Sequence, residues 1–252
     1  MRTSTVVAAA AVAATLAGAG CTKTGTTSAA PASAEAPSLT RPSRSAPSAT
    51  AEPTATPRAI PSSIPDAAFL QASDVPGKAK DKPRRLGAGD QDLPVFCDTG
   101  YYTGTGVGVR ATQSVFFVEA DAPPESTPKA AVYEDVLVFK GDGATTFMSG
   151  LRAAVQGCGE QKYEGVTVKN YLRGEVGAGD ESVLIERTRP ATDDAGEPVG
   201  GGALHHLFWA AVRVGDSVGL VSNTGWESVS ADRADTVHLG GKAAARLAAW
   251  RG

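Results

Sequence analysis

The chain has 252 residues, with 24 Lys and Arg against 27 Asp and Glu, and a net charge of −3 at pH 7. The sequence has no run or cluster of Lys and Arg residues, so we do not expect nucleic acid as a partner. The folded part that we expect at residues 64–252 has the size of one ordinary domain.

Residues 1–20 have the pattern of an export signal. Arg2 precedes an uncharged, Ala-rich run at 5–19, which is shorter than the ~18–20 apolar residues that a membrane-spanning helix needs. The segment 16–21, Leu-Ala-Gly-Ala-Gly-Cys, resembles the lipobox of bacterial lipoproteins, a family in which the cysteine carries diacylglycerol after signal removal. That family usually has Leu three residues before the cysteine, where this chain has Gly18. An ordinary secretory cut after Ala19 is therefore the alternative.

The number of cysteines favours a lipid on Cys21. The chain has three cysteines, and an exported protein with an odd number leaves one thiol to explain. If Cys97 and Cys158 pair, Cys21 is the remaining one, and acylation accounts for it. We therefore expect a chain anchored through lipid on Cys21 at the extracellular face of the cytoplasmic membrane, with a plainly secreted protein or an uncleaved anchor as the alternatives. Removing the signal takes away Arg2 and no acid, which brings the net charge to −4.

Residues 21–63 are expected to form a disordered tether. Ala, Ser, Thr and Pro dominate this stretch, and it holds few large aliphatic residues. Such a composition offers too little apolar surface to offset the entropy of ordering the chain. Prolines recur every few residues and favour extended conformations, as in a spacer.

Residues 64–252 are expected to form the folded domain. Six stretches alternate with period two and are rich in β-branched and aromatic residues, which predicts strands. They are 107–119, 131–139, 166–173, 182–188, 204–214 and 217–224. Gly215 and Asp216 separate the last two, a two-residue signal for a tight hairpin. Both alternating faces of 204–214 are partly apolar, with Phe208 on one face and Trp209 on the other, which predicts an inner strand covered on both sides.

Two helices are predicted. Asp142 can cap a helix in which Phe147, Leu151 and Val155 recur at helical spacing up to Cys158. An Ala-rich helix is predicted within 234–250, although two adjacent glycines weaken it.

The first predicted helix places one cysteine of the expected disulfide. Its Phe147 face should pack on the sheet and bring Cys158 to the buried side, near a strand beginning around Cys97. The oxidising exterior permits a Cys97–Cys158 bridge. The predicted fold class is α+β: an antiparallel sheet of five to seven strands, with one or two packed helices and one disulfide.

The histidines and serines form no recognisable catalytic pattern. His205 and His206 are adjacent on a predicted strand, so their side chains should point to opposite faces and cannot share a metal. His238 lies far off in sequence, and no HExxH or CxxC motif accompanies it. GxSxG and SxxK are also missing from the sequence. We therefore expect no enzyme, no metal site and no cofactor, with an unrecognised hydrolase as the remaining alternative.

Three aromatic residues are candidates for ligand binding. Tyr101 and Tyr102 lie in a Gly-rich stretch next to Cys97, and tyrosines on such loops make adaptable binding surfaces. Core packing is the competing interpretation of this pair. Trp209, on the predicted inner strand, is the third candidate.

Several segments resemble the extracellular sensor domain of the PknH-like serine/threonine kinases of actinobacteria. They are Ile64-Pro-Asp66, Phe69-Leu70, 73–77 (Ser-Asp-Val-Pro-Gly), 133–139, and 144–158 with its terminal cysteine. The resemblance implies an α+β fold whose sheet shapes a groove for an extracellular ligand, and freestanding lipoproteins are common in that family. Kinase sensor domains of this type generally have two disulfides, whereas this chain has cysteines for one.

The resemblance implies a binding role without naming a substrate. The anchor, the tether and the disulfide, in a sequence with no catalytic pattern, lead us to expect a non-catalytic ligand-binding or sensor-like role at the cell surface. The expected partners are the membrane, through the lipid, and an unknown small molecule, envelope component or partner protein. A lipid or glycolipid carrier and a structural or adhesive cell-wall protein are the alternatives.

Overall fold

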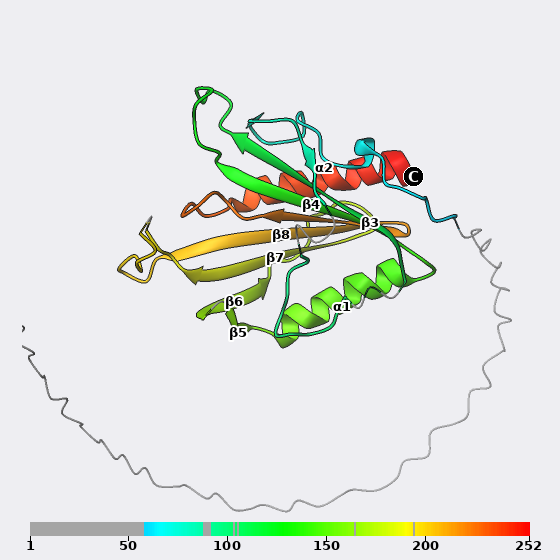
Figure 1. The fold of residues 1–252 in the computed structure, drawn as a ribbon. Coiled ribbons are helices and arrows are strands. Elements are labelled where there is room, and N and C mark those ends of the chain that lie inside the picture. Colours follow the sequence, from blue (N-terminus) through cyan, green and yellow to red (C-terminus); the bar gives the residue numbers. More distant parts are fainter. Residues whose placement is uncertain (1–57, 88–91, 103, 105, 164, 194) are drawn as a thin grey trace, which may run out of the picture. The chain divides into compact units, whose positions relative to one another are not determined.

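One antiparallel sheet organises the domain in the computed structural model, which describes residues 58–87, 92–102, 104, 106–163, 165–193 and 195–252 (Figure 1). These residues belong to the compact unit Thr54–Gly252. The signal segment, Cys21 and the tether up to residue 57 lie outside the described residues. Ile60 already packs against the core, so ordered contacts begin slightly before the boundary at residue 64 that the sequence suggests.

Within the described part of the chain the sheet has nine strands. They are β1 (Lys78–Ala79), β2 (Arg84–Arg85), β3 (Val107–Val118), β4 (Ala130–Phe139), β5 (Glu160–Tyr163), β6 (Val166–Leu172), β7 (Glu181–Pro190), β8 (Leu204–Val214) and β9 (Ser217–Asn223). The spatial order is β1-β3-β4-β9-β8-β7-β6-β5, and β2 pairs with β3. All six predicted strands are present, and three short ones raise the number above the expected five to seven.

A helix covers each side of this sheet, so the domain has three layers (Figure 1). The helix α1 (Gly143–Gly157) packs on β4, β6, β7 and β8, whereas α2 (Arg233–Arg251) packs on β8, β9 and the 3-10 turn η1 (Asp66–Ala68). Phe208 belongs to the core on the α2 side, and Trp209 to the core on the α1 side. The prediction of an inner strand that is covered on both faces is confirmed, because β8 lies between β9 and β7.

The expected turns and caps are only partly observed. Gly215, at φ 59°, lies in the tight turn that pairs Val214 with Ser217, which confirms the hairpin. At the start of α2, the side chain of Asp232 accepts a hydrogen bond from the backbone N of Asp235 at 3.0 Å. Asp142 is the N-cap residue of α1 but accepts no such bond. Its φ and ψ of −89° and 10° differ from the extended backbone that normally places a capping side chain.

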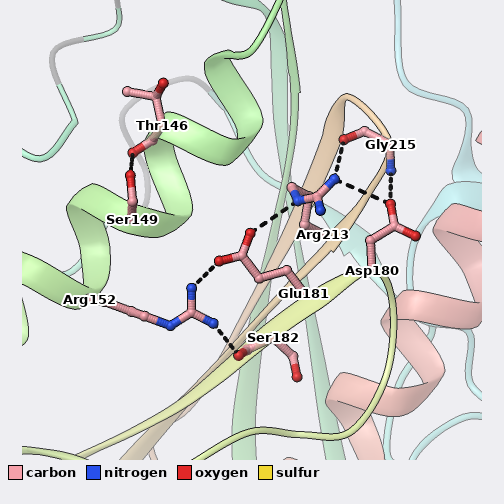
Figure 2. Close-up of polar contacts among 8 residues, drawn as sticks. All are labelled: Thr146, Ser149, Arg152, Asp180, Glu181, Ser182, Arg213 and Gly215. Carbon is pink, nitrogen blue, oxygen red and sulfur yellow. Dashed lines mark hydrogen bonds and ion pairs between the residues drawn. The ribbon is translucent and has the colours of Figure 1, made fainter. Parts of the chain in front are cut away.

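A polar network holds α1 at one end of the sheet (Figure 2). Arg152 of α1 donates to the carboxylate of Glu181 and, at 2.6 Å, to the backbone O of Ser182. Arg213 of β8 donates to the same Glu181 at 3.2 Å and to Asp180 at 3.3 Å. The helix is thereby fixed over the region where β7 begins and β8 ends.

The predicted disulfide is confirmed. Cys97 and Cys158 are bonded, with their Cα atoms 5.6 Å apart, and Cys158 follows α1 as a buried residue. We expected Cys97 at the start of a strand, but it lies in a turn in which Cys97 and Asp98 have φ values of 47° and 55°.

The α+β class, the antiparallel sheet and the packed helices are likewise confirmed. None of the described helices combines the length and the apolar character needed to cross a membrane.

Candidate functional site

The α1 side of the sheet carries two adjoining pockets beyond the area that the helix covers. We call the first the Arg187 pocket; its volume is about 420 Å³, and its lining includes Arg187 and Trp209. The second is the His205 pocket, of about 350 Å³, and its lining includes His205. Both are lined by Arg189, Leu207 and Thr224, so we treat them as one groove. The side chains that line it come from strands and loops and not from α1.

Strand register brings the groove residues together. Arg187 and Arg189 of β7 are paired across the ladder with Leu207 and His205 of β8, respectively. Trp209 of β8 is paired with Ser222 of β9, and Ser222 in turn with Tyr133 of β4. Because alternate residues of a strand share a face, these side chains converge on one side of the sheet.

Arg187 is a buried charged residue in the lining of the first pocket. The residue is 6% exposed, its Nε donates to Asn170 Oδ1 at 2.7 Å, and its Nη2 donates to the backbone O of Val95 at 2.6 Å. Its guanidinium carbon lies 5.1 Å from the ring centroids of both Phe96 and Trp209. Burial lowers the pKa of Arg187, since desolvation disfavours its charge. No carboxylate among the described residues forms an ion pair with it.

The wall of the Arg187 pocket is held by the disulfide. Val95 O also accepts a hydrogen bond from Gln161 Nε2 at 3.1 Å, and Gln161 Oε1 accepts one from the backbone N of Cys97. The Cys97–Cys158 bond ties the same turn to the end of α1. The segment 92–98, which we call the wall loop, is therefore fixed to β5, to β7 and to the helix.

His205 is a neutral, fully engaged side chain in the second pocket. Its Nε2 lies 2.9 Å from the backbone O of Val229, and a carbonyl only accepts, so Nε2 carries the proton. Arg189 Nε then donates to Nδ1 at 3.3 Å. Burial lowers the pKa of His205, which keeps the ring uncharged.

The other two histidines lie elsewhere. His206 Nδ1 lies 2.5 Å from Glu186 Oε1, and its ring stacks on Phe208, whose side chain belongs to the core on the α2 side. The prediction that His205 and His206 face opposite sides is confirmed. His238 Nε2 lies 3.0 Å from the backbone O of Asp74. In the described part of the chain, no cluster of His, Cys, Asp and Glu could hold a metal ion.

The three predicted ligand-binding residues lie in two places. The ring of Tyr101 packs on Phe147 of α1 with centroids 5.7 Å apart, and its hydroxyl donates to Pro94 O at 2.7 Å. The ring of Tyr102 packs on the same Phe147 at 6.1 Å. Neither tyrosine is among the residues that line the groove, whereas Trp209 is. Burial raises the pKa of Tyr101, as expected for a phenol inside a core.

Sequence reasoning missed Arg187 and Arg189. Charged residues at alternating positions of a strand normally indicate a solvent-facing side, and the predicted strand 182–188 ends before Arg189. The available signal was the two-residue spacing of the arginines directly after the apolar stretch 183–185, which puts both on the same face as Val183 and Ile185.

The described residues define an α+β domain with an open two-part groove. No family model and no curated protein matches the chain. The chain is similar to the crystal structure of the extracellular domain of PknH from Mycobacterium tuberculosis, with 15% identity over 73% of this chain and 92% of that chain, and a TM-score of 0.45. A likeness of this strength supports no argument about function, so the proposals below are based on the residues of this chain.

Proposed function

We propose that this chain is a cell-surface lipoprotein whose domain binds an extracellular ligand in the groove without transforming it. The observation that carries the proposal is the Arg187 pocket, at about 420 Å³. Small-molecule sites typically occupy ~300–1,000 Å³ and combine apolar walls with a few fixed polar groups. Leu207 and Trp209 supply apolar surface here, and Arg187 supplies a polar group that two hydrogen bonds hold in place.

The chemistry of the groove supports binding rather than catalysis. Both ring nitrogens of His205 are engaged, one by Val229 O and the other by Arg189. A histidine that acts as a general base needs a free nitrogen near a nucleophile. None of the hydrogen bonds in the described part of the groove joins His205 to a hydroxyl such as that of Ser222. The hydrogen bonds of the described groove residues thus favour binding, since none of them would activate a nucleophile through His205.

The extracellular location is supported by sequence and by the disulfide. The lipobox-like segment that ends at Cys21 indicates export and acylation. The Cys97–Cys158 bond is of a kind that persists in oxidising compartments, outside the cytoplasm.

A lipid or glycolipid carrier is the second candidate. Such a protein needs a cavity for an apolar ligand, and the Arg187 pocket exceeds the lower limit of ~300 Å³ for small-molecule sites. The His205 pocket continues it through Arg189, Leu207 and Thr224, which gives a long ligand room to extend.

The experiment is native mass spectrometry of the full chain, exported in a bacterial host and extracted gently. We expect a bound small molecule that raises the melting temperature when it is added back. Thr224→Phe, which fills the region shared by both pockets, should remove the bound mass. Thr192→Phe, at an exposed loop position, is the matched control and should keep it. A wild-type chain with no bound mass would contradict the proposal, and turnover of the captured molecule would contradict its non-catalytic part.

A further inference from the structure

We infer that the ligand of the groove carries an anionic group, a carboxylate or a phosphate, that lies against Arg187 and Arg189. The rest of the ligand has an apolar face that covers Leu207 and Trp209. This inference deepens the proposed function, because it names the ligand class of the same groove and depends on that groove being a binding site.

The first argument is the uncompensated charge of Arg187. A buried guanidinium is costly unless an opposite charge compensates it. Both of its hydrogen-bond acceptors, Asn170 Oδ1 and Val95 O, are neutral. The rings of Phe96 and Trp209 compensate the charge only in part. Its remaining nitrogen, Nη1, makes no hydrogen bond to the described part of the chain. An anion in the pocket would supply the missing opposite charge.

The second argument is the position of Arg189. It lies two residues further along β7, on the same face, and lines both pockets. Its Nε donates to the uncharged ring of His205, and none of the described carboxylates pairs with it. Alternate strand residues lie about 6.6–6.8 Å apart along the backbone, so two long guanidinium side chains can reach one carboxylate or phosphate. Two like charges this close also repel each other until an anion joins them.

Asp92 offsets only one of these two positive charges. Its side chain lines the Arg187 pocket, so the lining there carries two positive groups and one negative group. The pocket therefore keeps an excess of positive charge at Arg187 and Arg189.

The third argument is the apolar surface beside the arginines. Leu93, Val95 and Val168 line the Arg187 pocket together with Leu207 and Trp209. A bare inorganic anion would leave this surface exposed to water, whereas a ligand with an apolar face would bury it. An alkyl chain satisfies this requirement, and so does a sugar ring stacked on Trp209.

The test is calorimetric titration of the full exported chain, with its native ligand removed, using two matched pairs of probes. Octyl phosphate is compared with uncharged octyl glucoside, and glucose phosphate with glucose. We expect at least one phosphate to bind at least ~10-fold more tightly than its uncharged partner, the size of one charge-assisted hydrogen bond. If only octyl phosphate binds more tightly than its uncharged partner, the apolar part of the ligand is an alkyl chain. If only glucose phosphate does so, that part is a sugar ring. Either result supports the inference.

Arg189→Gln tests the residue assignment. It should weaken the bound phosphate probe ~10-fold. Arg187 is left unchanged, because its bond to Val95 also holds the wall loop. Arg233→Gln is the matched control: it removes the same charge from α2, on the opposite face of the sheet, and should leave the affinity unchanged. Equal melting temperatures of the two variants would show that folding is not the cause.

In these titrations the inference would be overturned by equal binding of charged and uncharged probes, by no effect of Arg189→Gln, or by no binding of any of the four probes at millimolar concentration. Native mass spectrometry distinguishes a failure of this inference from a failure of the proposed function. An uncharged molecule bound to the wild-type chain would refute the anion and leave the groove as a binding site, whereas a chain that carries no ligand would refute both.

Discussion

Gly240 shows how one residue sets the distance between α2 and the sheet. A Cβ at this position would lie 2.8 Å from the Cβ of Ala210 and 3.0 Å from Cγ1 of Val176. Glycine in a helix costs about 1 kcal/mol relative to alanine, so the close approach must offset that cost through packing. The next residue, Gly241, has no atom within 4 Å of such a Cβ.

We expect opposite effects from alanine at the two glycines. Gly240→Ala should destabilise the domain by ~1–3 kcal/mol, because overpacking outweighs the gain in helix propensity. Gly241→Ala should stabilise it by up to ~1 kcal/mol. Urea unfolding of both variants measures the free energies. Equal effects of the two substitutions would show that α2 does not contact β8 as closely as described.

Glu134 is a carboxyl group inside the core on the α2 side. It is 1% exposed, its Oε2 accepts a hydrogen bond from the backbone N of Leu70 at 2.6 Å, and its Oε1 has no hydrogen-bond partner in the described structure. Burial raises the pKa of Glu134 from 4.5 to about 8, because desolvation disfavours the charged form. At neutral pH the group is therefore mainly protonated in the folded state.

The stability of the wild-type protein should carry a pH-dependent contribution from Glu134. Between pH 4.5 and about 8 the unfolded chain has lost this proton and the folded chain has kept it. Raising the pH through this window therefore favours unfolding, by up to ~1.4 kcal/mol per pH unit. Glu134→Gln keeps an acceptor for Leu70 and removes the titration, so its stability relative to wild type should rise with pH. Parallel pH profiles in urea unfolding would contradict the raised pKa.

At the scale of elements, long alternating stretches were predictable and short ones were not. The stretch at 204–214 shows period two over eleven residues, and β8 has those bounds. The strands β1 and β2 have two residues each, which is too short for any period, and β5 has the polar sequence Glu-Gln-Lys-Tyr. These three exist because their partners β3 and β6 offer free ladder positions, a tertiary effect that local sequence does not contain.

The candidate site was less predictable than the fold, because it too depends on tertiary contacts that local sequence does not contain. Trp209 could be singled out because both faces of its strand are apolar. The contact between Arg187 and Val95 joins residues 92 positions apart, and neither residue carries a motif. The wall loop is irregular chain, so no period could place it beside β7.

The disulfide should stabilise the wall loop and the domain together. It closes a loop of 61 residues, which corresponds to about 4 kcal/mol by the chain-entropy relation. The double variant Cys97→Ala/Cys158→Ala should lose about that much free energy of unfolding in urea. A reductant should lower the stability of the wild-type chain similarly and leave the double variant unchanged. A loss below ~1 kcal/mol would mean that the reduced unfolded chain is already compact.

For the whole molecule, the arrangement of the layers explains why a groove exists at all. Both faces of the sheet are apolar at the inner strands, so both need cover. The helix α2 has 19 residues, whereas α1 has 15; Arg152 within α1 bonds to the start of β7, and the disulfide holds the residue that follows the helix. The part of the α1 side left without a helix carries Arg187, Arg189 and His205 beside Leu207 and Trp209. The sequence thus places polar groups where the helix leaves the sheet open.

Membrane attachment is a property of the whole chain, and we expect it to depend on Cys21. We expect the wild-type protein to incorporate a labelled fatty acid and to sediment with membranes, because two or more acyl chains anchor a protein stably. Cys21→Ala should be unlabelled and released, since Ala17 and Ala19 still offer an ordinary secretory cut. Its released domain should keep the melting temperature of the wild type, because the disulfide partners Cys97 and Cys158 are unchanged. An unlabelled, soluble wild-type protein whose mature chain begins at Gly20 would instead establish plain secretion and make Cys21 a free thiol.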